Sequence, residues 1–569
     1  MAPQACCGAD SSQNPPLQPY SDISGTGVIV SFIGSACLVL VLLIGNYLAC
    51  FDPTANPFAL DPDSSDAACS PGAPAPDPMS SDNSANWWRP NRVDCWFLGR
   101  VRRKRGPWRN AKKAFVECIM DMSDVQLLTG LAVLVSGFFS LQCGSPNGPP
   151  ISAYHWQMVV NLAWFSIIVH LASLSVLHTH LRRSPRMRLL RFTLSLLLLV
   201  LLLVAIGPTA FFNWRGPWIN SKIGAAGFVY DPNTSFSVSA ANMSSSAICY
   251  FDFSYGFSKF NQISSELSIK FSETLAAQEV ILSMTLLVSV FATRTVKLFK
   301  PLSSAFNSSL RRFASKALRS VFTTLLRSTF PSKSTPIRLQ LWRSLFLWPC
   351  VAVFYWARIL ADALTSQLFE VVAILFSLLW GTLKLFDLRG YSPALYEEES
   401  KFTFGQVLPV LLLVGSAFSA SNSFLSRLLN KSPTSDSTRQ PSPASGDDTM
   451  IPTSDTAEQV GLAATEKEWD LNTAISNDCY ASNSWFGPCV VFLILQFTIT
   501  LYAPLTIRVV RSQAHNSNIG YEGPLSNRPN QLRLGLQILP ALFELLAPLL
   551  VAISLDQKLN AHAKRVGLC

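Results

Sequence analysis

Amide and imidazole side chains inside an apolar stretch are the first residues of this sequence that could do chemistry. Gln157 and Asn161 are four residues apart and Trp164 follows after three more, so the three share one face of a helix. His170 lies on the same stretch. Because an unpaired polar group is costly in lipid, we expect this face to contact protein. It either fixes helix packing through hydrogen bonds or lines a polar path or a small-molecule site.

A second group consists of charged residues in the C-terminal half of the chain. Arg358 and Asp362 are four residues apart and can pair on one helix face, and Glu370 begins the next apolar stretch. These charges either shape a helical hairpin or form an ion or proton site near the outer surface.

Glu544 is the third candidate, because it lies within an apolar stretch between Pro540 and Pro548. Proline leaves backbone carbonyl groups without their helical partners, and such carbonyls can line a polar cavity. A buried, protonated carboxyl group with a purely structural role is the alternative.

Motifs of common soluble enzymes are missing. The thirteen cysteines contain no Cys-x-x-Cys pair, and the chain has no Walker A pattern, dinucleotide-binding glycine motif or His-Glu-x-x-His. His178 and His180 are two apart and do not face each other on a helix, so they are a poor metal pair. We therefore expect no catalytic residue, no cofactor and no metal, and a protein that is not an enzyme.

Long apolar stretches are the elements that must position these residues. Hydrophobic residues make up 49% of the 569-residue chain and charged residues only 14%, against about 25% in soluble proteins. Stretches of about 18–22 residues are long enough to cross a bilayer as helices. The prediction is an all-α membrane protein, a polytopic bundle of about ten transmembrane helices with disordered loops.

Loop charge predicts the orientation of these crossings. Positive residues gather in alternate loops, which indicates a cytoplasmic side for those loops and extracytoplasmic N- and C-termini. The expected order is an extracytoplasmic tail at 1–25, a crossing at 26–50, a basic, partly disordered cytoplasmic loop at 51–122, three crossings in 123–212, an extracytoplasmic loop at 213–276, a crossing at 277–297, a basic amphipathic cytoplasmic segment at 298–341, three crossings in 342–424, a disordered extracytoplasmic loop at 425–484, two crossings in 485–555, and a C-terminal tail at 556–569. The apolar stretch 342–385 is too long for one crossing, so it is divided at residues 361–367 into two. This division places residues 361–367 outside and residues 386–402 inside.

The net charge of +10 is concentrated in the cytoplasmic loops, which favours membrane orientation over nucleic-acid binding. The same residues are suited to anionic lipids at the cytoplasmic face. The candidate lipid contacts are Arg102, Arg103, Lys104, Arg105, Arg312, Lys316 and Arg319. The expected location is the plasma membrane or an endomembrane.

The loop at 213–276 carries features of an extracytoplasmic segment. Asn233 and Asn242 each begin an acceptor pattern for N-glycosylation. Cys249 in this loop is predicted to pair with Cys143, which lies in another loop placed on the same side.

Several short motifs resemble those of a large family of filamentous-fungal multi-pass membrane proteins. They are Ser-Asp-Val-Gln-Leu-Leu-Thr-Gly at 123–130, Tyr-His-Trp-Gln at 154–157, Leu-Ala-Trp-Phe-Ser at 162–166, His-Leu at 170–171, and Tyr-Ser-Asp-Ile-Ser-Gly-Thr-Gly-Val at 20–28. The resemblance covers residues 14–212 and implies a multi-pass topology in a fungal setting. It carries over no activity and no catalytic residue.

These observations leave three functional hypotheses. The first is a non-enzymatic membrane organiser, sensor or receptor-like protein, favoured by the disordered segments and the basic cytoplasmic face. The second is a transporter or channel for a small solute or ion, favoured by the intramembrane ionisable residues. The third is an intramembrane lipid-modifying enzyme, for which no paired catalytic groups are found.

Overall fold

Helices dominate the structure, which is a computed structural model that describes residues 7, 17–54, 90–102, 111–142, 150–181, 184–212, 243–267, 271, 274–305, 356, 359–390, 398–429 and 486–496. Within these ranges the β-structure is limited to an isolated bridge between Ser152 and Ser246. Seven helices are long and apolar enough to cross a membrane: Ser21–Ala49, Lys112–Phe139, Ala153–Val176, Pro185–Phe211, Ala276–Leu298, Gln367–Phe386 and Phe404–Ser426. The chain is therefore an all-α, multi-pass membrane protein. The expected crossing in 534–555 lies outside the described residues, and the one at 342–360 lies largely outside them. Of the one expected at 485–505, the structure describes a short apolar helix over Phe486–Gln496.

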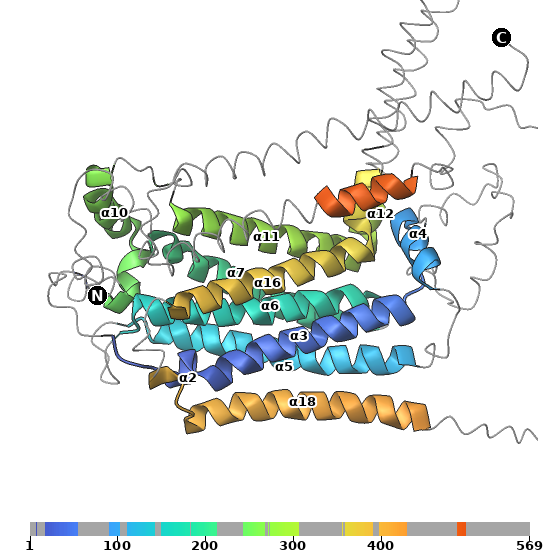
Figure 1. Ribbon diagram of the computed structural model, residues 1–569, viewed down its shortest axis with the longest axis horizontal. Coiled ribbons are helices and arrows are strands. Elements are labelled where there is room, and N and C mark those ends of the chain that lie inside the picture. Colours follow the sequence, from blue (N-terminus) through green and yellow to red (C-terminus); the bar gives the residue numbers. More distant parts are fainter. Residues whose placement is uncertain are drawn as a thin grey trace, which may run out of the picture.

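The long helices lie side by side, and the short ones gather at their ends (Figure 1). The long elements are α3 (Thr26–Ala49), α5 (Lys112–Phe139), α6 (Ala153–Leu181), α7 (Pro185–Ile206), α11 (Leu275–Leu298), α16 (Gln367–Gly390) and α18 (Phe404–Leu429). The short ones are α2 (Ser21–Ser24), α4 (Arg92–Val101), η4 (Gly207–Phe211), η5 (Ala247–Phe251), α10 (Phe253–Leu267) and α12 (Lys300–Ala305).

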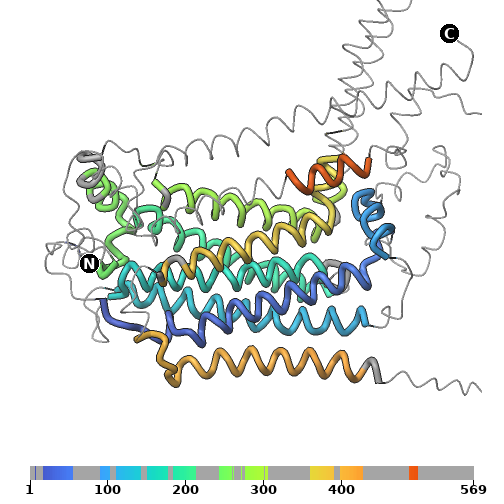
Figure 2. Tube along the Cα trace, viewed as in Figure 1, coloured from blue at the N-terminus to red at the C-terminus, as the bar shows by residue number. Residues whose placement is uncertain are grey.

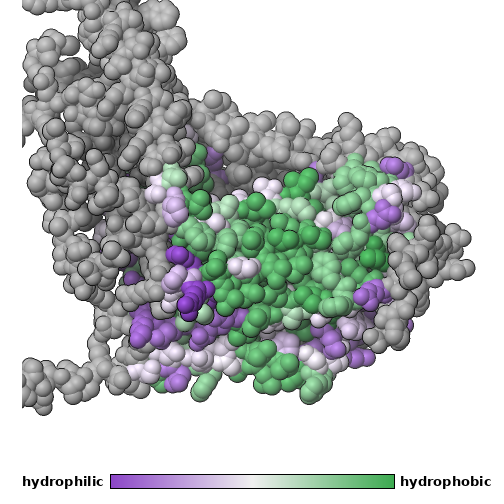
Figure 3. All heavy atoms as spheres, turned by 180° about the vertical axis from the view of Figure 1, so that it is seen from behind, coloured by the Kyte–Doolittle hydropathy of each residue, from purple (hydrophilic) through white to green (hydrophobic). Residues whose placement is uncertain are grey.

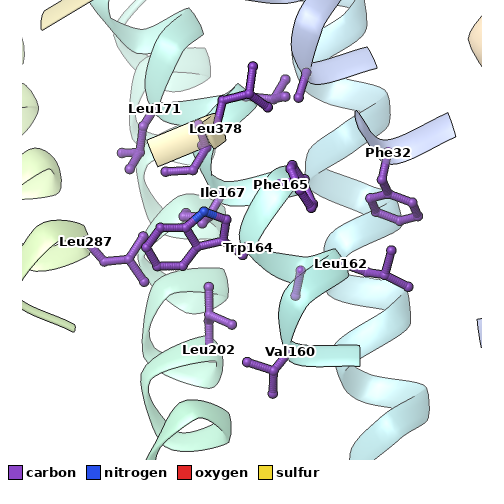
Figure 4. Close-up of a cluster of buried hydrophobic side chains, with 14 of the residues drawn as sticks. Phe32, Val160, Leu162, Trp164, Phe165, Ile167, Leu171, Leu202, Leu287 and Leu378 are labelled. Atoms are coloured by element: carbon purple, nitrogen blue, oxygen red, sulfur yellow. The ribbon is translucent and has the colours of Figure 1, made fainter. Parts of the chain in front are cut away.

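Helix α6 is the centre of the bundle. Its membrane-spanning part is buried along its whole length, against α3, α5, α7, α11 and α16. A helix that is apolar on all sides can be stable only when other helices cover every face or when lipid does. Figure 4 shows Trp164 and Phe165 of α6 among Leu202, Leu287 and Leu378 from three other helices.

Small residues allow the close approach of helices to α6. A Cβ atom on Gly130 of α5 would lie 2.4 Å from the Cβ atom of Ser166, and one on Gly381 of α16 would lie 2.6 Å from the Trp164 ring. Without a hydrophobic force between helices in lipid, such close packing is a main source of their association.

The two ends of the bundle are defined by contacts between distant segments. At one end, the Gly27 amide donates to Gln406 Oε1 at 2.9 Å, where α3 and α18 both begin. At the other end, Tyr47 near the end of α3 donates to Asp94 Oδ1 of α4 at 2.9 Å. We name these the Tyr20 end and the Asp94 end, since Tyr20 lies just before α2 at the first.

The order of crossings after residue 360 differs from the expectation. Residues 361–367 were expected on the side opposite loop 51–122, but the Gln367 amide donates to Asp94 Oδ2 at 2.9 Å, so both segments lie at the Asp94 end. Residues 386–402 were expected on the side of loop 51–122, yet Tyr154 at the Tyr20 end donates to Glu399 at 3.2 Å. The expected alternation is therefore wrong here, because it rested on the length of one apolar stretch and not on helix pairing.

The same reversal applies to the end of α18. Phe424 packs against Phe115 at the start of α5, with ring centroids 4.7 Å apart. Helix α18 therefore ends at Leu429 near the Asp94 end, on the side of α4, so residues 425–429 do not lie at the opposite end as was expected for 425–484.

The disulfide bond also differs from the expectation. Cys249 pairs with Cys7, with Cα atoms 5.6 Å apart, and not with Cys143, which lies outside the described residues. The bond joins the N-terminal segment to η5, which is held at the Tyr20 end because the Ala247 amide donates to the Ile151 carbonyl at 3.0 Å. A separation of 242 residues gives no local sequence signal for this pairing.

The outer faces of the bundle are apolar. Seen from behind, a broad hydrophobic area covers the middle of the molecule, and hydrophilic residues gather toward its edges (Figure 3). Helix α18 lies along the outside of the bundle (Figure 2). Only 11% of its most apolar 18-residue stretch is buried. Such an area is what contact with a lipid bilayer requires.

Candidate functional site

A buried ion-pair group joins α11 and α16 at the Asp94 end. Glu370, in the first turn of α16, pairs with Arg294 and with Lys297 of α11, whose Nζ lies 2.6 Å from Glu370 Oε1. The Arg294 and Glu370 side chains are 2% and 5% exposed. Lys297 Nζ also donates to the Thr365 carbonyl just before α16. One carboxylate thus bridges two cations from one face of α11, which lie three residues apart.

Asp94 brings a second carboxylate to the same place. It accepts hydrogen bonds from Tyr47 Oη at 2.9 Å and from Ser366 Oγ at 2.8 Å. It also accepts from the Gln367 and Leu368 amides, at 2.9 and 3.1 Å. Asp94 therefore caps α16 from outside, where unpaired amides and the helix dipole favour an anion. We call Asp94, Arg294, Lys297 and Glu370 the ionic cluster, which contains two cations and two carboxylates, and in which both cations pair with Glu370.

Helix α4 is positioned for this capping by its own first turn. Asn91 accepts from the Val93 and Asp94 amides at 3.0 and 3.3 Å and so caps α4. The Asn91 amide group also donates to the Asp362 carbonyl at 2.7 Å. The two helix starts are therefore locked together, and Asp94 is fixed by its neighbours as well as by its own bonds.

Sequence reasoning found one member of the ionic cluster. Glu370 was expected near a pair of Arg358 with Asp362, but its partners in the structure are on α11, and Arg358 lies outside the described residues. Asp362 is buried at the Asp94 end. The remaining cluster members were not recognised, although Arg294 and Lys297 occur three apart at the end of an apolar helix.

The polar residues expected on α6 all lie inside the bundle. Gln157, Asn161 and His170 are each buried. His170 Nδ1 is 2.9 Å from Ser123 Oγ of α5, which is in turn 2.7 Å from Ser173 Oγ. Within the described part of the chain, Gln157 Oε1 and Asn161 Nδ2 have no hydrogen-bond partner.

Gln157 of α6 lines a small cavity between α11 and α16, toward the Tyr20 end of these two helices. Glu279 of α11, Lys384 of α16 and Thr209 of η4 also line this cavity, whose volume is about 10 Å³. That is about the space of one water molecule, and a water there could bond the Gln157 oxygen. Charged side chains of both signs therefore occur at each end of the α11–α16 pair.

We call the boundary between these two helices the α11–α16 seam. Its middle is held by Trp380 Nε1 of α16, which donates to Ser283 Oγ of α11 at 3.1 Å. The seam thus carries Glu279 and Lys384 toward the Tyr20 end, and Arg294, Lys297 and Glu370 at the Asp94 end.

A separate polar contact closes the Tyr20 end. Glu399 is fully buried and accepts from Tyr154 Oη, and its Oε1 lies 3.4 Å from His155 Nε2. Burial alone would raise the pKa of the Glu399 carboxyl, but hydrogen bonds from His155 and Ser24 hold that pKa below its ordinary value. This contact fixes the segment before α18 to the start of α6.

The expected lipid contacts and glycosylation sites are mostly beyond the described residues. Arg102 donates to the Tyr47 carbonyl at 2.7 Å, so its guanidinium contacts the C-terminal end of α3. Arg103, Lys104, Arg105, Arg312, Lys316, Arg319, Glu544, Asn233 and Asn242 lie outside the described ranges. In the part that the structure describes, no group of three or more His, Cys, Asp or Glu residues could hold a metal ion.

Comparison with known proteins gives one distant similarity. The chain is 31% identical over 162 residues to the elsinochromes biosynthesis cluster protein HP3 of Elsinoe fawcettii. The match covers 28% of this chain and 48% of that protein, so the chain spans about half the length of this relative. No family model and no solved structure matches the chain.

Proposed function

We propose that this multi-pass membrane protein is a transporter of a small solute or ion, with the α11–α16 seam as its charged path. The observation that carries the proposal is that the same two membrane-spanning helices bear buried charges at both ends. The proposed activity involves no chemical conversion of the solute.

The energetic cost of these charges supports the proposal. Removing a charged group from water costs several kcal/mol, and well-packed apolar residues often stabilise a protein as well as a buried ion pair does. Charged residues inside membrane-spanning segments therefore commonly mark paths for ions or substrates. The polar atoms of Gln157 and Asn161 extend this chemistry along α6, toward the interior between the two ends.

The nature of the cargo is suggested by the relative. Its name assigns it to an elsinochromes biosynthesis cluster. This setting favours an organic solute as the cargo, with a proton or another ion moving through the seam charges.

Charge movement in proteoliposomes on a solid-supported membrane tests the proposal. A rapid pH jump should give a transient current with the wild-type protein, because a transporter rearranges or exchanges ions at its buried charges. The informative variant is Arg294→Gln/Glu370→Gln, which removes one cation and one anion together and leaves no excess charge. It should remain folded and lose the current.

The matched control is Glu398→Gln, a carboxyl substitution at an exposed position of the Tyr20 end. This variant should keep the wild-type current. A wild-type protein without any charge movement, or a folded double variant with an unchanged current, would contradict the proposal. Either result would favour a membrane organiser, sensor or receptor-like protein that uses the charges only for packing.

A further inference from the structure

Helix α18 has the smallest buried share of the seven candidate spans in the described residues, and it packs on α3 and α5. A cavity of about 140 Å³ lies there, lined by Phe32 of α3, Met122 and Val125 of α5, and Leu408, Leu412 and Leu413 of α18. These residues lie within the candidate membrane spans of all three helices, near the middle of the α5 span and in the first half of the α3 and α18 spans. The cavity therefore lies along the apolar spans, in the half nearer the Tyr20 end, where α3 and α18 begin.

The polar side chains in the cavity wall are already bonded within the protein. Ser31 Oγ donates to the Pro409 carbonyl at 2.6 Å, and Thr129 Oγ1 donates to the Val125 carbonyl at 2.7 Å. Ser35 Oγ donates to the Phe32 carbonyl at 3.0 Å and accepts from Gln126 Nε2 at 2.6 Å. A polar ligand would find few free partners here, and the desolvation of its own groups would oppose binding.

The cavity is open toward the outer face of the bundle. Leu408 and Leu412 line it, yet they are 62% and 45% exposed. The rest of the outer face of α18 is also apolar, with Leu411, Val414 and Phe418 more than half exposed. An occupant can therefore enter sideways from the bilayer along a continuous apolar surface.

We propose that this cavity binds the end of a membrane-lipid acyl chain. A dry apolar cavity of roughly 150 Å³ accommodates benzene, so the volume fits about six carbon atoms. That size matches the terminal part of one chain, whose remainder would lie along the exposed face of α18. Since α18 contacts the bundle over a small part of its surface, the chain would also complete its packing.

Photo-crosslinking in lipid nanodiscs tests the site. The probe is a phosphatidylcholine with a diazirine at the methyl end of one acyl chain, and labelled positions are mapped by mass spectrometry. Wild-type protein should carry label at residues 122–129, in addition to the general labelling of exposed residues near Val135.

Val125→Phe fills the cavity, and Val135→Phe places the same substitution on an exposed position of the same helix. We expect label at residues 122–129 to fall about tenfold in the first variant, which corresponds to the loss of roughly two buried methylene groups. The second variant should keep wild-type labelling there.

A second matched pair guards against misfolding of the first variant. Leu412→Phe narrows the cavity from α18, whereas Leu411→Phe alters the neighbouring exposed residue. Only Leu412→Phe should reduce the label.

Absence of label at residues 122–129 of the wild type, or equal label in both members of both pairs, would overturn the assignment. Labelling of these residues by a water-soluble diazirine probe in place of the lipid would also overturn it, because it would show a hydrated space.

Discussion

Neutralising Glu370 tests how the ionic cluster holds the bundle together. In Glu370→Gln, Arg294 loses its carboxylate partner and stays buried, while Lys297, whose side chain is 25% exposed, loses a contact of 2.6 Å. Breaking a buried pair by removal of one partner typically costs roughly 3–5 kcal/mol of unfolding free energy. We expect a loss in this range, since the Glu370 and Arg294 side chains are almost fully buried.

The assay is reversible unfolding in mixed micelles, followed by helical circular dichroism as the fraction of denaturing detergent rises. Arg294→Gln and the double variant with Glu370→Gln complete a thermodynamic cycle. The double variant should be more stable than Glu370→Gln alone, because it buries one uncompensated charge fewer. Glu398→Gln, at an exposed position, should change stability by less than about 0.5 kcal/mol. If Glu370→Gln cost under about 1 kcal/mol, or if the two substitutions were additive, the pairing would not have the energetic role assigned to it.

Three further predictions follow from the contacts at the two ends. Asp94→Ala should destabilise the start of α16 by about 1–3 kcal/mol, because the Gln367 and Leu368 amides lose their acceptor. Hydrogen exchange should become faster only in the first turn of α16. An equal increase in exchange along the whole helix would refute the prediction. The pKa of Glu399 is lowered on folding, so its contribution to stability is present above its ordinary pKa of 4.5 and is lost as pH falls through the lower folded value. The melting temperature of the wild type should therefore drop more steeply below pH 4.5 than that of Glu399→Gln. Parallel curves of melting temperature against pH would exclude the effect. Non-reduced peptide mapping should find Cys7 linked to Cys249, and Cys7→Ser should free the Cys249 thiol for alkylation whereas Cys143→Ser should not.

Helix positions were the part of the fold that could be predicted without coordinates. The apolar stretches around residues 26–50, 123–142 and 154–178 correspond to α3, α5 and α6. This success has a simple reason, because a chain in lipid must satisfy its backbone hydrogen bonds internally, and length and hydropathy then define each helix. The expected start of the second crossing was less accurate, since α5 begins at Lys112 and continues beyond the apolar run.

The partners of the polar residues could not be predicted in the same way. Local spacing offers Arg358 and Asp362 to each other, but it gives no information on Arg294, which lies 76 residues before Glu370 and meets it only when α11 and α16 pack together. The same limit explains the disulfide bond, because two cysteines separated by 242 residues are brought together by the packing of η5 near the N-terminus.

The order of amino acids is enough to establish that this protein crosses a membrane several times and that ionisable groups lie within its helices. Both properties depend on composition along short stretches, since the cost of exposing backbone and charge to lipid acts residue by residue. Tertiary structure alone decided which helix became the fully covered centre, that residues 361–367 lie beside Asp94, and that the charges of α11 and α16 meet. Those outcomes depend on close approach at residues such as Gly130 and Gly381, and packing between distant segments leaves no periodic signal in a single chain.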